Sequence, residues 1–259
     1  MHQLRLFFTA LQFFTRLPIP RWVGFESDWL QHASRYFPLV GFVVATIAAA
    51  VYTVSALVLP APVAAILSTA ASIYVTGAFH EDGFADTCDG FGGGMTRERV
   101  LEIMKDSRVG AYGAIGMTCM LGTKVATLAM LPPVTAIVAL FVAHPLSRLA
   151  ATALIWRMTY ARSEGKSKPL AQQMTGMEFG IAAVSVLLPA LGLVVAGLMQ
   201  ARVLGACVIA AALAAIWLAR TFDRRIGGYT GDCLGAVQQL AEVSVYLVVL
   251  ASLGHGALA

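Results

Sequence analysis

The sequence predicts an all-α, polytopic integral membrane protein with about seven transmembrane helices, and three observations lead to this fold class. Hydrophobic residues make up 58% of the 259-residue chain, against the ~45–50% that is usual in soluble domains. Charged residues make up only 12%, against a usual ~25%, and the mean hydropathy is +0.76. No charged residue lies between Phe37 and Phe79, a stretch long enough for two helices of the ~20 residues that cross the hydrocarbon core. The composition therefore excludes a disordered chain, and four Cys exclude a disulfide-rich secreted scaffold.

The uncharged runs, and the prolines between them, place the individual spans. Pro60 and Pro62 mark a turn within the first run, and Pro132-Pro133 marks a later one. Arg202 lies in a tight turn between the fifth and sixth spans. The predicted spans cover residues 37–59, 63–80, 109–131, 134–156, 179–200, 203–219 and 233–253.

The distribution of Lys and Arg predicts the orientation of these spans. Most of the 18 basic residues fall in the N-terminal segment and in residues 81–108, 157–178 and 220–232, which lie on one side of a seven-span chain. Basic residues are enriched in cytoplasmic loops, so we expect the N-terminus and these three loops to face the cytoplasm. The net charge of +4 then reflects topology and requires no nucleic-acid partner.

The first 21 residues predict a segment that lies in the membrane interface. Aromatic residues and Arg are interleaved from Leu4 to Pro20, a pattern that suits an interfacial helix. The segment lacks the long uncharged core and small-residue cleavage site of a signal peptide. We expect residues 1–259 to form one integral membrane domain with this segment as an anchor.

An acidic cluster directly after the second predicted span is the strongest chemical signal. Asp82, Asp86 and Asp89 stand at positions i, i+4 and i+7 and would share one face of a helix. Three like charges on one face repel each other unless a cation is bound, and carboxylate oxygens are ligands that Mg²⁺ prefers. We therefore predict a Mg²⁺ site at these aspartates with Glu81 beside it, and His80 as an adjacent substrate contact. The alternative is a solvated acidic loop.

Further polar residues are candidates for contacts with an anionic substrate. Residues 96–106 predict a short amphipathic helix with Thr96 as its N-cap. Four residues that can carry out such contacts follow at the entrance of the third span: Lys105, Asp106, Ser107 and Arg108. A diphosphate held by Mg²⁺ needs cations around its remaining oxygens.

Charged residues inside the spans are the other candidates. Lys124, Arg148 and Glu242 lie within predicted spans, where a central Lys or Arg costs roughly 2.5–3.5 kcal/mol on insertion scales and faces a partner or an aqueous cavity. Asp232 follows a glycine-rich segment and is interpreted as either a helix N-cap or a ligand. The topology gathers the acidic and glycine-rich loops on one side, which predicts one site built from loops 81–108, 157–178 and 220–232.

Several of these motifs together resemble a known family. Residues 80–90 (HEDGFADTCDG) and 102–110 (EIMKDSRVG) are similar to motifs of the cobalamin (5'-phosphate) synthases, also called adenosylcobinamide-GDP ribazoletransferases. Residues 14–20 (FTRLPIP), 37–41 (FPLVG) and 228–236 (GYTGDCLGA) resemble further landmarks of that family, in the same order. The resemblance spans about residues 5–250.

The resemblance implies a transferase of the bacterial inner membrane that requires Mg²⁺. The 3'-hydroxyl of α-ribazole or its 5'-phosphate attacks the phosphate on the aminopropanol arm of adenosylcobinamide-GDP, and GMP leaves. Asp82, Asp86 and Asp89 are then the catalytic and metal-binding residues, and Arg162 is a candidate contact for the nucleotide or the corrin. The implied partners are the two substrates and the lipid bilayer. A homo-oligomer or other cobalamin-assembly enzymes are the further partners to consider.

Other functions remain as alternatives at this stage. A CDP-alcohol-type membrane phosphotransferase also uses aspartates, but its pattern requires Arg after Ala85, where this chain has Asp86. An aspartate-rich prenyltransferase would need a second DxxxD loop. A transporter could line an ion path with Lys124, Arg148 and Glu242, but it would leave the aspartate cluster without a purpose.

Overall fold

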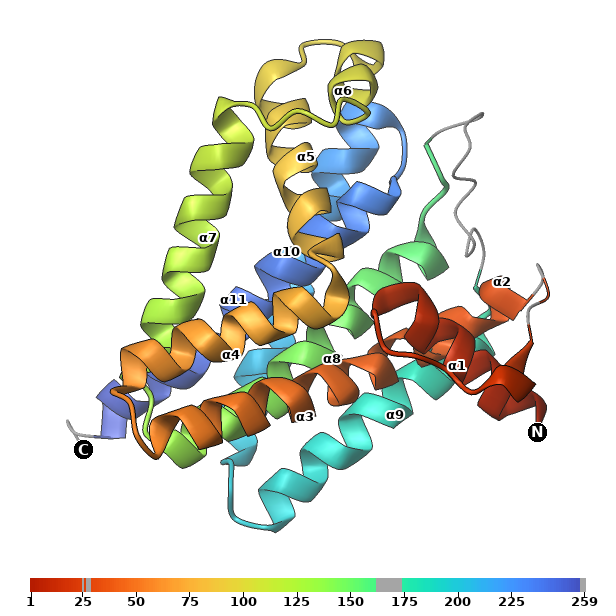
Figure 1. The fold of residues 1–259 in the computed structure, drawn as a ribbon. Coiled ribbons are helices and arrows are strands. Elements are labelled where there is room, and N and C mark those ends of the chain that lie inside the picture. Colours follow the sequence, from red (N-terminus) through yellow and green to blue (C-terminus); the bar gives the residue numbers. More distant parts are fainter. Residues whose placement is uncertain (25, 27–28, 162–173, 257–259) are drawn as a thin grey trace.

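The computed structural model describes residues 1–24, 26, 29–161 and 174–256, and within them most of the chain is helical, with an isolated bridge between Tyr160 and Tyr229 in place of any longer strand. This confirms the all-α prediction. The α-helices are α1 (His2–Phe14), α2 (Trp29–Ala33), α3 (Phe37–Ala56), α4 (Ala61–Thr76), α5 (Phe79–Gly93), α6 (Arg97–Ile103), α7 (Ala111–Met130), α8 (Pro133–Arg157), α9 (Gly176–Val195), α10 (Ala201–Ile226) and α11 (Gly231–Gly256). Figure 1 shows their arrangement.

Six of the described helices, one of them comprising α2 and α3, are long and apolar enough to cross a membrane, and α4 and α5 together give a bent seventh. This agrees with about seven spans but corrects the second one. The span predicted at 63–80 ends at Thr76, and the chain then bends by 90° into α5. Gly77 and Ala78 form the corner with φ of 66° and 60°, a left-handed conformation that a non-glycine residue adopts only at a cost.

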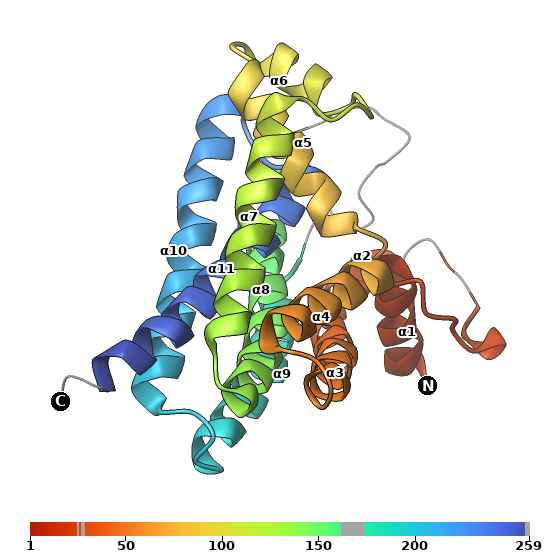
Figure 2. The ribbon, with the colours of Figure 1, turned by 60° about the vertical axis from the view of Figure 1, so that its left-hand side comes forward.

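The predicted loops are shorter than the sequence indicated, because helices extend into them. Residues 81–108 are largely α5 and α6, with Thr96 accepting a hydrogen bond from the Arg99 amide as the predicted N-cap. The loop predicted at 220–232 shrinks to four residues, since α10 continues to Ile226 and α11 begins at Gly231. Helix α5 packs against α7 and α11, and α10 packs along α11 (Figure 2).

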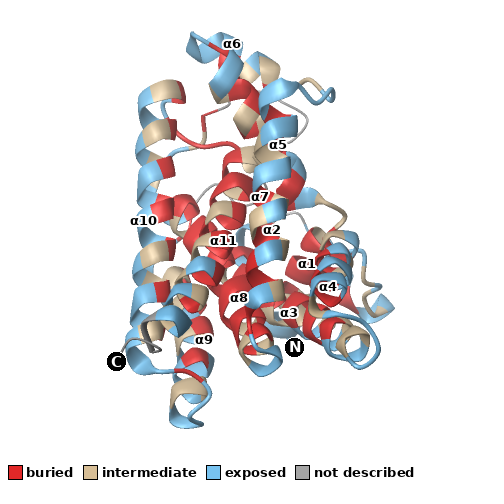
Figure 3. Ribbon diagram, turned by 90° about the vertical axis from the view of Figure 1, so that its left-hand side faces the viewer, coloured by how far each residue is buried: buried red, intermediate tan, exposed pale blue. Residues whose placement is uncertain are grey.

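Helices α8 and α11 form the centre of the bundle. In their most apolar 18-residue windows, 78% and 67% of the residues are buried, against 22% for α9 and 28% for α10. Figure 3 shows the same contrast between the buried central helices and the exposed outer face of α10. The outer helices therefore carry the apolar surface, as expected of spans that face lipid, while the centre is free to hold polar groups.

The N-terminal helix α1 is present, as predicted, and it packs against the bundle through one buried face (Leu6, Thr9, Ala10, Leu11 and Phe14). Residues after it continue this packing. The Arg16 amide donates to the Val75 carbonyl at 2.8 Å, and its guanidinium lies 5.4 Å above the Tyr74 ring. These two contacts hold the N-terminal segment against the end of α4, beside the corner between α4 and α5.

Candidate functional site

Helix α5 carries the acidic cluster, and its aspartates differ in exposure. Asp82 is exposed, Asp86 is intermediate and Asp89 is buried. The helix is continuous from Phe79 to Gly93, so the three residues do lie along one side of it, as their spacing requires. Asp82 and Asp86 are therefore the members of the cluster that a ligand can reach.

Asp89 is engaged by the neighbouring helix. Its carboxylate accepts hydrogen bonds from the amides of Gly110, at 2.7 Å, and Gly113, at 2.8 Å. These amides begin α7, where helix N–H groups have no intrahelical acceptor and the helix dipole favours a negative charge. The structure gives Asp89 the role of a cap at the N-terminus of α7, and its predicted contact with Mg²⁺ stays a prediction.

Glu81 points into the core of the bundle, away from the exposed side of α5. Its side chain is buried, and its Oε1 accepts a hydrogen bond from Gln239 Nε2 of α11 at 2.8 Å. The structure therefore does not bring Glu81 together with Asp82. Within the described residues, no group of three or more His, Cys, Asp or Glu side chains is arranged to hold a metal ion.

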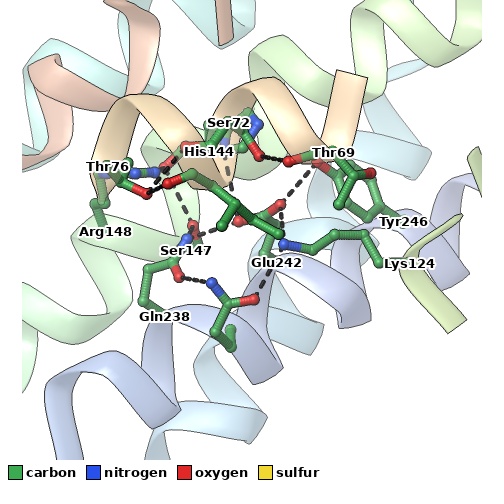
Figure 4. A network of polar contacts seen from close by, with 12 residues as sticks. Thr69, Ser72, Thr76, Lys124, His144, Ser147, Arg148, Gln238, Glu242 and Tyr246 are labelled. Atoms are coloured by element: carbon green, nitrogen blue, oxygen red, sulfur yellow. Dashed lines mark hydrogen bonds and ion pairs between the residues drawn. The ribbon is translucent and has the colours of Figure 1, made fainter. Parts of the chain in front are cut away.

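The charged residues inside the spans meet in one buried network (Figure 4). Lys124 Nζ lies 2.9 Å from Glu242 Oε1 and 3.0 Å from Gln239 Oε1. Glu242 also accepts from Tyr246, at 3.0 Å, and from Gln238, at 2.7 Å. Burial of these charges is tolerated because each has an opposite charge or a hydrogen-bonding partner.

His144 and Arg148, both on α8, complete this network. His144 Nδ1 lies 3.4 Å from Glu242 Oε2, and Arg148 donates from one terminal nitrogen to the His144 carbonyl at 2.9 Å. Arg148 is only 3% exposed. The predicted substrate contacts Lys124, Arg148 and Glu242 are thus brought together, but they contact one another in the core.

Sequence reasoning missed the uncharged members of this network. Gln238, Gln239, Ser147 and Tyr246 lie within spans, and Gln238 donates to Ser147 Oγ at 3.1 Å as well as to Glu242. The sequence did hold a signal for this network, because Gln238 and Gln239 precede the intramembrane Glu242 by four and three residues. Amide side chains buried in a span require hydrogen-bonding partners.

The contact between α5 and α11 brings Asp232 to the aspartate helix. A Cβ atom added to Gly83 would lie 2.9 Å from the Asp232 Cα, so the two backbones touch at the turn between Asp82 and Asp86. Thr230 caps α11 by accepting from the Cys233 amide at 3.3 Å. The cap is therefore Thr230, whose hydroxyl also lies 3.3 Å from Asp232 Oδ2, so the N-cap interpretation of Asp232 is wrong and its ligand role stays a prediction.

Lys105, Ser107 and Arg108 are exposed between α6 and α7. Arg108 forms a two-pronged ion pair with Asp106, with its Nε and a terminal nitrogen 3.0 and 2.6 Å from the two carboxylate oxygens. The hydrogen bond from the Arg108 side chain, followed by one from its backbone, lowers the pKa of Asp106 to about 2. This exposed cationic segment can contact anions outside the bundle.

The described parts of the three predicted loops meet. Arg225 at the end of α10 donates to the Gly94 carbonyl at 2.6 Å, and Arg97 of α6 donates to the Ala161 carbonyl at 2.9 Å. The Ala161 amide in turn donates to the Tyr229 carbonyl at 2.8 Å. Arg162, another predicted contact, lies outside the described residues.

His80 is buried and stacks on Phe14 of α1, with ring centroids 5.4 Å apart and planes 11° from parallel. It lies between the polar network and an aromatic pocket, since it lines both cavities. The structure thus places His80 inside the bundle, beside the start of the aspartate helix.

Comparison with known proteins identifies the family. A family model described as cobalamin-5-phosphate synthase matches residues 6–250. An adenosylcobinamide-GDP ribazoletransferase of Leptothrix cholodnii is 46% identical, with 97% of each chain covered. Proteins of the same name from Shewanella frigidimarina, at 44% identity over 97% of this chain and 96% of the relative, and Ralstonia nicotianae, at 45% over 95% of each, are also similar. No solved structure matches the chain significantly. Since the match covers nearly all of the chain, the protein belongs to the cobalamin-5-phosphate synthase family.

Proposed function

We propose that this chain transfers the adenosylcobinamide-phosphate group from adenosylcobinamide-GDP to α-ribazole or α-ribazole-5'-phosphate. The observation that carries the proposal is the nearly full-length match to relatives of that name. In the reaction, the 3'-hydroxyl oxygen of the acceptor bonds to the phosphorus on the aminopropanol arm. The bond from that phosphorus to the oxygen of GMP breaks, and the hydroxyl proton passes to a base.

Asp82 and Asp86 suit the way in which proteins usually bind Mg²⁺ together with a phosphate substrate. Mg²⁺ commonly takes one or two carboxylates and completes its shell with waters and substrate phosphates. These two side chains are one helical turn apart and are not fully buried, whereas Asp89 and Glu81 are held by other helices. A bound Mg²⁺ would neutralise charge on the diphosphate and on the leaving GMP.

The remaining roles follow from exposure and contacts. Both carboxylate oxygens of Asp89 already accept hydrogen bonds from α7 amides. Asp86 and Asp232, on facing helices, are better placed to take the proton from the acceptor hydroxyl. Lys105 and Arg108 are exposed cations that suit the outer phosphate oxygens.

The enzyme is proposed to sit in the bacterial inner membrane with this site on the cytoplasmic face. The asymmetry of Lys and Arg supports the orientation. Single cysteines placed at exposed Met95 and Leu198 in a cysteine-free background test it. Position 95 should react with an impermeant reagent from the cytoplasm and position 198 from the opposite side, and the reverse labelling would overturn the orientation.

The test of the reaction is GMP release by purified protein in liposomes. Release should require adenosylcobinamide-GDP, α-ribazole-5'-phosphate and Mg²⁺ together, and EDTA should abolish it. Asp82→Asn should remove turnover while the protein stays monodisperse, and Asp223→Asn, on an exposed position of α10, serves as the matched control. No release by folded wild-type protein would overturn the transfer reaction. Near-normal turnover of Asp82→Asn would overturn the metal assignment.

A further inference from the structure

An aromatic pocket opens among α1, α3, α5, α8 and α11. Its volume is about 70 Å³, and rings contributed by α1, α3 and α5 line it (Phe13, Phe14, Phe37, Phe79 and His80). The rings pack on each other: the Phe14 centroid lies 4.6 Å from that of Phe37 and 5.5 Å from that of Phe79. Such a cluster presents ring faces and edges suited to a planar aromatic guest.

The pocket shares a wall with the carboxylate site. Gly231, Gly235 and His80 line it, and they belong to the same α5–α11 contact that brings Asp232 against Gly83. A Cβ atom added to Gly235 would lie 2.9 Å from the His80 carbonyl oxygen. The lining residues His80 and Gly231 are therefore within two positions of Asp82 and Asp232 along the chain.

Polar groups at the wall on α8 and α11 complement the rings. Arg148 and Gln238 line the pocket, and Arg148 Nε is buried without a hydrogen-bonding partner in the part of the chain that the structure describes. Arg148 and Gln238 also line the polar cavity around Glu242, so these two side chains separate the buried network from the ring-lined pocket.

The size of the pocket suits a small planar group. Its volume of about 70 Å³ is several times the roughly 10–15 Å³ that a single water requires. A corrin is far larger than this space, and a phosphate would lack the hydration that an apolar lining denies it.

We infer that this pocket receives the aromatic base of the acceptor nucleoside, with the ribose left at the mouth toward Asp82 and Asp232. The inference rests on the proposed function, and it assigns the acceptor site to α1, α3, α5, α8 and α11. The base is the most apolar part of the two substrates, so its insertion among the helices gives this reaction a use for a membrane domain. The pocket walls then set which bases are accepted.

Filling the pocket tests the inference. Ala151 lines it from α8, and Ala151→Phe places a ring where the base would lie. The KM for α-ribazole-5'-phosphate should rise by about tenfold or more, while the KM for adenosylcobinamide-GDP stays unchanged. Ala212→Phe, on the exposed side of α10, is the matched control and should change neither. An unchanged acceptor KM in Ala151→Phe would overturn the inference.

A second variant and a binding measurement keep the test decisive. Ile155→Ala enlarges the same pocket and should improve the relative kcat/KM for acceptors whose bases carry bulkier ring substituents; an unchanged preference would count against the pocket. Calorimetry with α-ribazole alone reports binding without turnover, so it separates this inference from the transfer reaction. If wild-type protein binds the nucleoside but releases no GMP, the proposed function fails and the pocket stands. If Ala151→Phe instead loses a co-purified lipid and binds the nucleoside normally, the pocket is a lipid site and the inference fails.

Discussion

The ion pair between Lys124 and Glu242 offers a quantitative test of how the core holds charge. Their side chains are 1% and 2% exposed, and Nζ lies 2.9 Å from Oε1. Lys124→Met removes this contact and the hydrogen bond to Gln239 at 3.0 Å. Glu242 would then remain buried without its nearest cation, the situation that strongly destabilises proteins.

The expected loss of unfolding free energy is about 3 kcal/mol. Removal of one partner from a buried pair typically costs about 3–5 kcal/mol. The lower end applies here because Tyr246 and Gln238 still donate to the carboxylate, and His144 Nδ1 stays 3.4 Å away. In the double variant Lys124→Met with Glu242→Gln, no charge is left unpaired in this pair, so at least about 1 kcal/mol should return.

The assay is reversible unfolding in mixed detergent micelles, followed by far-ultraviolet circular dichroism. Arg99→Met is the control, since the Arg99–Glu102 pair is 58% and 68% exposed and should contribute less than about 1 kcal/mol. A loss below 1 kcal/mol for Lys124→Met, or a double variant as unstable as the sum of the single ones, would refute the view that the pair compensates its own burial.

Three further predictions concern α7 and the exposed cationic segment. Asp89→Ala should cost about 1–2 kcal/mol of stability because two α7 amides lose their acceptor, whereas Asp82→Ala should leave the Tm unchanged; equal effects would contradict the cap. Gly113→Ala should lower the Tm because the added Cβ would lie 2.4 Å from Asp89 Oδ2. Gly122→Ala, on the same helix, meets nothing within 4 Å and should raise the unfolding free energy by about 0.5–1 kcal/mol. Thermal unfolding of the two variants compares these effects directly. The lowered pKa of Asp106, about 2 against an ordinary 3.8, means that the stabilising pair with Arg108 is complete above about pH 4 and is lost as pH falls through 2. A carbon-13 titration of the Asp106 carboxyl, assigned with Asp106→Asn, checks this value, and a midpoint near 3.8 would contradict the pairing.

The course of the spans was largely predictable, and the exception has a local cause. Long uncharged runs and paired prolines gave α3, α7, α8 and α9 because hydropathy and helix breakers act within a few residues. The bend between α4 and α5 was not predictable in this way. It depends on Ala78 in a left-handed conformation, which the packing of residues around Arg16 supports from another part of the chain.

The sequence by itself determined the membrane fold, the helical spacing of Asp82, Asp86 and Asp89, and the family, because composition, periodicity and motif order are properties of the linear chain. Tertiary structure decided which of these charges a substrate can reach. Glu81 and Asp82 are adjacent in sequence, yet one contacts Gln239 in the core and the other is exposed. Asp89 meets the start of α7, and Lys124 meets Glu242 from a distant helix. The physical reason is that a charge within an apolar bundle is stable only where packing supplies its partner, and those partners come from helices far away in the sequence.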